Sequence, residues 1–406
     1  MKEFNAPKHV ALVIRLLGGR SGGAERIYCE LANLLAENGY NVTCLHFDTT
    51  DAPPFYPLDS KVELINLQGL QDTLKQKLNK VIKNIPFLPK DISKRIDWYN
   101  KNDYFISQLK DYFLFSRPDI AISLMPPANT PTLLAAKGTS VKVIATNHNV
   151  PKEDYHSPYR WDPNPIDREL RLKALDYAAA IHVLFPSFGE WFPSHLHDRI
   201  VAIPNYVSME FKRADQQRDR DNLILAVGRL APVKNYMQLL NAWSLIADEF
   251  PNWSVLLYGT GPQKRELKSR ISELGMQDSF VLGGHRKDLG SEYSRASIFC
   301  HPALFEGFGL SPAEALFLQT PVISYADCPG VNQFVKNGVN GLAIQRDSDG
   351  RSLANALRSL IIDSERREEL GRNGPPSVAE FSYDRYRSSW INLIERLSKG
   401  TENGHA

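Results

Sequence analysis

The sequence predicts an α/β protein made of two doubly wound, Rossmann-like domains, each built on a parallel sheet. Its 406 residues are about twice the length of a typical single domain. In both halves, short apolar segments alternate with amphipathic segments, which is the pattern of repeated β-α-β units. The apolar segments are continuous, as is typical of strands that helices cover on both faces. We expect ligands to bind beyond the carboxyl ends of the strands, in a cleft between the domains.

The first half, residues 1–205, is predicted to form one domain that opens with a β-α-β unit. A strand over 9–17 leads into the glycine-rich turn 18–23, and a helix follows over 24–38. A loop rich in proline and aromatic residues, 151–165, leads into another helix. The remaining strands of this half are expected at 41–47, 120–124, 141–146, 180–184 and 200–203.

Residues of about 55–118 interrupt this alternation and are expected to form an irregular, partly helical insertion. Its basic residues are Lys75, Lys77, Lys80, Lys83, Lys90, Lys94 and Arg95. Its apolar residues include Ile82, Ile85, Phe87, Leu88 and Trp98. This combination has two interpretations: peripheral association with an anionic membrane, or a solvated helical face.

The second half, residues 206–380, is predicted to form the other domain. A charged segment over 216–222 has the character of a linker. Strands are expected at 223–227, 254–258, 279–282, 298–301 and 322–324. Helices are expected at 236–249, 263–274, 288–295 and 312–318, and a last helix at 383–397 precedes a polar tail.

The composition is that of an ordinary globular protein, with 43% hydrophobic and 23% charged residues. The formal net charge of +2 gives no indication of nucleic acid as a partner. The N-terminus lacks the features of a signal peptide, and no segment approaches the roughly 20 apolar residues of a membrane span. We therefore expect a cytoplasmic protein. The four cysteines (Cys29, Cys44, Cys300 and Cys328) form no CxxC pair and are expected to be reduced and buried.

The segment from Gly228 to Asn235 follows a predicted strand and precedes a helix. Asn235 is a candidate N-cap, and the free N–H groups of a helix N-terminus attract anions. Arg229 and Lys234 add two cations at the same end of the sheet, where together they could neutralise a diphosphate. The alternative is that both are solvated charges on a loop.

A second loop, residues 305–314, carries two glutamates after a predicted strand. Ser311 and Glu314 have the spacing of a capping box, with Pro312 at the first helical position, so Glu314 either caps the helix or binds sugar hydroxyls. Glu306 precedes two glycines in the loop, where an acidic residue has no packing role, and it is therefore a site candidate.

Three further features lie at strand ends. His148 follows the strand over 141–146, where a lone histidine is either exposed or hydrogen-bonded, or faces Glu306 from the other domain. Gly22 and Gly23 open a helix after the first strand and form another anion-friendly turn. The segment 259–262 is not a dinucleotide fingerprint, because position 264 is Lys, so a nicotinamide oxidoreductase is poorly supported.

These motifs, taken in order, resemble the retaining glycosyltransferases of family 4, which have the two-domain GT-B fold. The matching segments are 22–26, 204–205, 227–235, 259–262, 321–324 and 340–342, together with the E-x7-E pair of Glu306 and Glu314. The resemblance covers nearly the whole chain except about residues 55–118. It implies that residues 206–380 bind the donor, that 1–205 bind the acceptor, and that the helix within 381–406 crosses back onto the first domain.

The resemblance also implies the roles of individual residues. The implied donor-binding residues are Arg229, Lys234, Gly307, Phe308, Gly309, Leu310 and Glu314. Among them, Arg229 and Lys234 hold the diphosphate and Glu314 binds the ribose. Glu306 and His148 are the implied catalytic residues near the donor sugar.

The loop at Gly22 and Gly23 is implied to close on donor or acceptor. The implied reaction moves a hexose-type sugar from a nucleotide sugar, with UDP as the favoured nucleotide, to a glycan or lipid-linked saccharide with retention at the anomeric carbon. The sequence shows no metal-ligand spacing, so we expect no metal and no other cofactor. The place of action would be the cytoplasm, and the membrane interpretation of the insertion would put it at the inner face of the plasma membrane.

Two alternatives stay open on the sequence. A nucleotide-sugar epimerase would have the same fold but no acceptor, and the E-x7-E pair argues against it. A non-catalytic nucleotide-sugar-binding partner would have lost its site residues, whereas all the charged ones are present.

Overall fold

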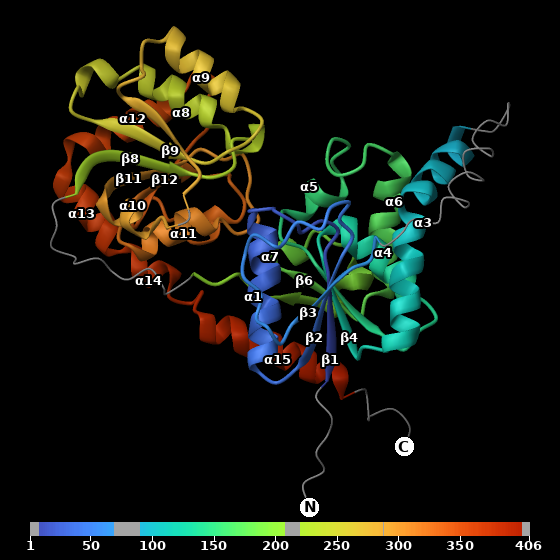
Figure 1. Cartoon of the computed structure of the whole chain (residues 1–406). Coiled ribbons are helices and arrows are strands. Elements are labelled where there is room, and N and C mark those ends of the chain that lie inside the picture. Colours follow the sequence, from blue (N-terminus) through green and yellow to red (C-terminus); the bar gives the residue numbers. More distant parts are fainter. Residues whose placement is uncertain (1–7, 69–89, 208–219, 287, 400–406) are drawn as a thin grey trace, which may run out of the picture. The chain divides into compact units, whose positions relative to one another are not determined.

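The chain divides into two compact units in a computed structural model that describes residues 8–68, 90–207, 220–286 and 288–399. Unit 1 comprises Met1–Pro204 and Arg387–Ala406, and unit 2 comprises Asn205–Tyr386 (Figure 1). Each unit is built on a sheet in which all the paired strands run parallel. The predicted fold class, two doubly wound α/β domains, is thereby confirmed.

Unit 1 contains a seven-stranded sheet in the order β3-β2-β1-β4-β5-β6-β7. Its strands are β1 (His9–Val13), β2 (Asn41–His46), β3 (Glu63–Asn66), β4 (Ile120–Leu124), β5 (Lys142–Thr146), β6 (Ala180–Val183) and β7 (Ile200–Ala202). Its helices are α1 (Gly23–Glu37), α3 (Lys90–Ser116), α4 (Pro126–Ala136), α5 (Pro151–Tyr155), α6 (Pro165–Ala174) and α7 (Pro186–Gly189), with 3-10 turns η1 (Leu175–Tyr177) and η2 (Ser194–Arg199).

The helices of unit 1 cover the sheet because their apolar faces are buried. Helix α1 packs on β2, and α3, α4 and α6 pack on one another, with α4 against β4 and β5 (Figure 1). Helix α4 was not predicted, because it contains an internal proline, Pro131. It is anchored instead by Asn129, whose side-chain amide donates to the carbonyl of Thr146 at 2.9 Å.

The predicted irregular insertion is more regular than expected where the structure describes it. It contributes the edge strand β3, which the sequence pattern missed because two of its four residues are exposed. It also contributes α3, a helix of 27 residues. Trp98 on this helix is only 1% exposed, and its Nε1–H donates to Asp167 at 2.6 Å. Trp98 is therefore part of the core of unit 1 and does not contribute to the membrane interpretation.

Much of the basic and apolar set assigned to this insertion falls on residues outside the described ranges. These residues are Lys75, Lys77, Lys80, Ile82, Lys83, Ile85, Phe87 and Leu88. Of the remainder, Lys94 and Arg95 are exposed, and Arg95 pairs with Glu169 at 3.3 Å. The membrane interpretation stays a prediction.

The last helix, α15 (Tyr383–Ser398), places its final turns in unit 1. Glu395 accepts hydrogen bonds from Lys8 at 2.5 Å and from the Tyr40 hydroxyl at 2.9 Å. Trp390 is fully buried, with its ring 4.9 Å from the ring of His182. These contacts tie the end of the chain to the sheet of the first unit.

Unit 2 contains a six-stranded sheet in the order β10-β9-β8-β11-β12-β13. Its strands are β8 (Asp221–Val227), β9 (Ser254–Tyr258), β10 (Phe280–Gly284), β11 (Ala296–His301), β12 (Val322–Tyr325) and β13 (Gly341–Ile344). Its helices are α8 (Tyr236–Ser244), α9 (Lys264–Glu273), α10 (Gly290–Arg295), α11 (Leu310–Phe317), α12 (Arg351–Ile362), α13 (Ser364–Arg372) and α14 (Gly374–Val378), with 3-10 turns η3 (Pro232–Lys234), η4 (Ala247–Glu249) and η5 (Val331–Gln333).

Two groups of helices flank this sheet. In Figure 1, α8, α9 and α12 lie above the strands, and α10, α11 and α14 lie below them. Trp243 and Leu357 anchor the first group in the core. The helix predicted over 236–249 is broken, because α8 ends at Ser244 and the chain continues into the separate turn η4. Elements α12, α13 and β13 were not predicted.

All four cysteines are buried and free, which confirms their prediction as reduced core residues. Burial raises the pKa of Cys29 to about 12, so its thiol stays protonated near neutral pH. No helix within the described ranges is long and apolar enough to cross a membrane.

Candidate active site

The loop that follows β8 is fixed by close backbone contacts with the loop that follows β9. The N–H of Gly228 donates to the carbonyl of Tyr258 at 3.0 Å, and the N–H of Leu230 donates to that of Thr260 at 2.9 Å. A Cβ atom at Gly259 would collide with the carbonyl oxygen of Gly228. The glycines of segment 259–262 are therefore explained by loop packing, in line with the absence of a dinucleotide fingerprint.

Asn235 takes the N-cap position of α8, as predicted, but it does not cap the helix with its side chain. The residue stands at the N-cap position, but its backbone is left-handed, with φ of +56°, and its side chain makes no capping hydrogen bond. The turn η3 directly precedes it, and the chain must change direction before α8 can begin. Asparagine suits this place because it tolerates the left-handed conformation better than most residues.

Lys234 and Glu306 form an ion pair at the carboxyl ends of β8 and β11. The Lys234 ammonium contacts Glu306 Oε1, and the two side chains are 19% and 15% exposed. The imidazole Nε2 of His301, the last residue of β11, lies 3.0 Å from the same oxygen. The structure thus brings two predicted residues together, and it corrects the expectation that Glu306 has no packing partner.

The Glu306 carboxylate is ionised near neutral pH. Burial alone would raise its pKa, but the Lys234 cation and His301 outweigh this effect and lower the pKa to about 2. Burial lowers the pKa of His301, against the opposing effect of Glu306, so His301 is neutral near pH 7. The sequence analysis missed His301; the available signal was a polar residue at the end of an otherwise apolar strand.

The backbone around Glu306 is anchored from two sides. The N–H of Leu304 donates to the carbonyl of Val233 at 2.8 Å, and the N–H of Glu306 donates to that of Pro329 at 3.3 Å. A Cβ atom at Gly330 would collide with the carbonyl of Gly307. The loops after β8, β11 and β12 are therefore packed as one layer, which holds Lys234 and Glu306 at a fixed spacing.

Among the predicted donor-binding residues of this loop, Phe308 is part of the hydrophobic core. Its ring lies 5.6 Å from that of Phe334 and 5.1 Å from that of Phe381. Gly309 has a φ of +88° and takes the N-cap position of α11, and Leu310 is the first helical residue. The segment 307–310 can therefore meet a ligand through its backbone, with the Phe308 ring directed into the core.

The predicted capping box at Ser311 and Glu314 is wrong. Helix α11 begins before Ser311, so this residue lies inside the first turn, and its hydroxyl donates to the carbonyl of Val227 at 3.2 Å. Glu314 is 5% exposed and accepts a hydrogen bond from the hydroxyl of Tyr293 at 2.9 Å. Tyr293, on α10, was not identified from the sequence. This geometry excludes the role of Glu314 in helix capping. The binding of sugar hydroxyls stays a prediction.

Arg229 is the second cationic residue that was predicted on the loop after β8. It lies on the loop after β8, five residues before Lys234, and its side chain is exposed. An exposed guanidinium and a partly buried ammonium on the same loop provide two cationic donors for an anion. We find no group of three or more His, Cys, Asp or Glu side chains suited to a metal ion in the described parts of the chain.

His148 lies at the carboxyl end of β5 in unit 1, as predicted. Its Nε2 lies 3.0 Å from the Thr146 hydroxyl, and its ring centroid is 5.3 Å from that of His182. Burial, with a smaller effect of His182, holds the pKa of His148 well below its usual value, so the ring is neutral. Its position opposite Glu306 stays a prediction.

The glycine-rich turn of unit 1 is partly occupied by a carboxylate of its own. Gly22 takes the N-cap position of α1, and Gly23 is the first helical residue. Asp48, which is 5% exposed, accepts hydrogen bonds from the N–H groups of Leu17 at 2.8 Å and Gly18 at 3.1 Å. Asp48 was not identified from the sequence, and it reduces the capacity of this turn to hold an anion.

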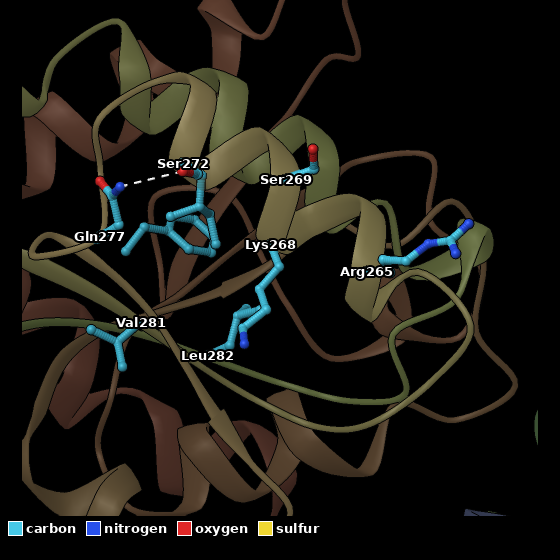
Figure 2. Close-up of a pocket in the computed structure, with 9 residues that line it drawn as sticks. Arg265, Lys268, Ser269, Ser272, Gln277, Val281 and Leu282 are labelled. Atoms are coloured by element: carbon cyan, nitrogen blue, oxygen red, sulfur yellow. Dashed lines mark hydrogen bonds between the residues drawn. The ribbon is translucent and has the colours of Figure 1, made fainter.

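A separate cavity of about 570 Å³ lies between α9 and the edge strand β10 (Figure 2). Its lining residues are Arg265, Lys268, Ser269, Ile271, Ser272, Gln277, Phe280, Val281 and Leu282. None of the predicted site residues lines it. The chemistry-bearing residues of unit 2 are thus at the strand ends, away from this cavity.

Comparison with known proteins agrees with the fold. The family model described as "Glycosyltransferase Family 4" matches residues 21–211, and "Glycosyl transferases group 1" matches 208–376. An N-acetyl-D-galactosaminyltransferase of Campylobacter jejuni, whose name places its acceptor on PP-undecaprenol, is 25% identical over 380 residues, which are 93% of this chain and 96% of that protein.

Two solved structures match nearly the full length of this chain. Sucrose-phosphate synthase of Thermosynechococcus elongatus has a TM-score of 0.77 at 19% identity and covers 97% of this chain and 100% of its own. The pneumococcal O-GlcNAc transferase GtfA, in complex with UDP and GlcNAc, has a TM-score of 0.75 at 15% identity and covers 97% and 99%. At these identities the likeness shows the shared fold.

The fold, the paired strand-end motifs and the two matching models define a glycosyltransferase with the two-domain GT-B architecture. Within that class, the chain belongs to the family 4 type, and its activity is glycosyl transfer in bacterial glycan biosynthesis.

Proposed function

We propose that this glycosyltransferase moves a hexose-type sugar from a nucleoside-diphosphate sugar, with UDP as the favoured nucleotide, to a saccharide or lipid-linked glycan. The observation that carries the proposal is the loop after β8 in unit 2, which bears Arg229 and Lys234 and whose Lys234 contacts Glu306. The C. jejuni relative, named for a PP-undecaprenol-linked acceptor, and neighbours solved with UDP, UDP and GlcNAc, or UDP-glucose support this choice of substrates.

In the proposed reaction, the bond between the anomeric carbon and the diphosphate oxygen breaks through an oxocarbenium-like state. The nucleoside diphosphate leaves with the bonding electron pair, and Lys234 and Arg229 stabilise the charge that grows on it. The acceptor hydroxyl bonds to the anomeric carbon on the face from which the diphosphate departs. Its proton passes to the leaving phosphate oxygen, which balances the step and retains the configuration.

The remaining residues position the donor in this proposal. Glu314, held by the Tyr293 hydroxyl, accepts hydrogen bonds from the ribose, and Glu306 does so from the donor sugar. His148 stands near the anomeric carbon as a neutral imidazole, so it can donate or accept a hydrogen bond there without adding charge.

We further propose that the reaction requires no metal ion, since two side-chain cations are available to the diphosphate. Transfer should then continue at an unchanged rate after treatment with excess EDTA. A loss of activity that Mg²⁺ or Mn²⁺ restores would refute this part of the proposal.

Thermal protection by nucleotides tests the proposed donor site. We would measure the unfolding temperature of the wild type, Lys234→Ala and Lys268→Ala with UDP, GDP, ADP and their common sugar derivatives. A ligand at 100 times its Kd stabilises the folded state by about 2.7 kcal/mol. Selective protection that is lost in Lys234→Ala and kept in Lys268→Ala, an exposed lysine in the cavity of Figure 2, supports the site. Absence of protection by every nucleotide would contradict it.

A further inference from the structure

His301 is a buried imidazole next to the proposed diphosphate site. It is 1% exposed, and neither ring nitrogen has a hydrogen-bond partner among the residues that the structure describes. A buried polar group without a partner costs free energy and is rare in folded proteins. Glu306 Oε1 lies 3.0 Å from its Nε2 as an ion-pair contact, without a hydrogen bond to that nitrogen.

The same carboxylate oxygen is contacted by the Lys234 ammonium. A diphosphate that binds Lys234 must therefore compete with Glu306 for the ammonium. Glu306 is only 15% exposed, so the loss of Lys234 would leave a poorly solvated carboxylate without its counter-charge. Such an uncompensated charge is strongly unfavourable. Diphosphate binding therefore calls for a second donor to Glu306.

The other titratable groups whose charges act on this cluster do not supply that donor. Burial raises the pKa of Tyr236 well above its usual value and the pKa of Cys328 to about 12, so both stay protonated, but the described residues show no hydrogen bond from either group to Glu306. The guanidinium of Arg346 already pairs with Asp327 at 2.7 Å. His301 is the group that is close to the carboxylate and has its ring nitrogens available.

We propose that His301 is a positioning residue that receives Glu306 when a donor diphosphate engages Lys234. Without ligand, Glu306 accepts from Lys234. With ligand, Lys234 donates to phosphate oxygens, and the Nε2–H of His301 donates to Glu306. The imidazole is nearly parallel to the ring of Phe299, at 14° and 6.3 Å, and this stacking limits its movement. The carboxylate thus keeps a partner in both states. The inference rests on the proposed function.

The test is calorimetric titration of the full chain with UDP, GDP and ADP, without a sugar. The variants are His301→Phe, which removes the donor at similar volume, and His301→Gln, which keeps an N–H at similar reach. We expect His301→Phe to weaken binding about tenfold, and His301→Gln to stay within about twofold of the wild type. In a Glu306→Gln background, the change His301→Phe should have no effect on Kd, because no carboxylate needs a second donor.

Equal binding by the wild type and His301→Phe would overturn the proposal, and so would a tenfold loss that persists in the Glu306→Gln background. The unfolding temperature of each ligand-free variant separates a folding defect from a binding defect; His301→Met replaces His301→Phe if the latter does not fold. If none of the three diphosphates binds the wild type, the proposed function itself fails, whereas binding that does not depend on residue 301 contradicts this inference alone.

Discussion

Units 1 and 2 both place a loop that contains glycine after an inner strand of a parallel sheet, but their polar side chains are arranged differently. In unit 1, Asp48 accepts from the N–H groups of Leu17 and Gly18, so backbone donors near the turn are satisfied internally. In unit 2, the loop carries Lys234, whose partner Glu306 lies 72 residues away along the chain. A glycine-rich turn therefore does not form an anion-binding site by itself. Whether it binds an anion depends on the charged side chains around it.

The largest expected effect in unit 2 concerns acid stability. Glu306 has a pKa of about 2 in the folded chain, below the usual value of 4.5. Its contribution to stability is therefore fully present above pH 4.5 and is lost as the pH falls toward 2, and it amounts to roughly 3 kcal/mol. Urea unfolding of the wild type between pH 5 and 2 should show this loss, and Glu306→Gln should show a correspondingly shallower decline.

Glu190→Gln, at an exposed position of unit 1, is the control for this experiment and should follow the wild type. Parallel curves for the wild type and Glu306→Gln would mean that the ion pair does not hold the carboxylate ionised. The contrast between the two units would then lose its electrostatic basis.

A second prediction tests whether unit 1 contributes a reacting-site residue despite its internally satisfied loop. His148→Ala should lower kcat about 100-fold, the size of effect seen when one positioned donor is removed, with a much smaller change in KM for the donor. Steady-state kinetics with a nucleotide sugar would check this. His156→Ala, an exposed histidine of the same unit, should be unaffected. An unchanged kcat in His148→Ala would restrict the chemistry to unit 2.

A third prediction addresses Asp48, the residue that most clearly separates the two loops. Asp48→Ala leaves two backbone donors and His46 Nδ1, which lies 2.8 Å from the same carboxylate oxygen, without their acceptor. We expect a loss of about 2 kcal/mol in the free energy of unfolding. Asp51→Ala, at an exposed site nearby, should change it little. If the two variants were equally stable, Asp48 would not be what fixes this loop.

The smallest expected effect is that of Tyr293→Phe. Loss of the hydroxyl that donates to Glu314 at 2.9 Å should raise KM for the donor about tenfold while leaving kcat close to that of the wild type, because the ribose would be held less firmly. Tyr159→Phe, at a 96% exposed position of unit 1, is the control. A fall in kcat without a change in KM would assign Tyr293 and Glu314 a role outside donor binding.

Sequence patterns predicted most of both sheets because buried parallel strands are short, continuous apolar runs. They failed where that signal was weak: β3 is half exposed, and α4 contains an internal proline. They also placed Lys234 and Glu306 correctly at strand ends, since position along an element is local information.

The sequence could not predict which groups form hydrogen bonds with one another at the two sites. Tyr293 reaches Glu314 across 21 residues, and Asp48 reaches Leu17 across 31, so no periodicity or spacing connects them. The two helices lack the expected side-chain capping hydrogen bonds for a related reason. Side chains of the right type, at Asn235 and Ser311, stand where the backbone turns differently or where the helix has already begun.

A crystal structure of the chain with bound UDP tests the central claim most directly. We expect phosphate oxygens about 3 Å from the Lys234 ammonium and beside Arg229, with the Glu306 carboxylate moved from Lys234 to His301. A diphosphate held instead by the turn at Gly22 and Gly23, with the contact between Lys234 and Glu306 intact, would contradict it.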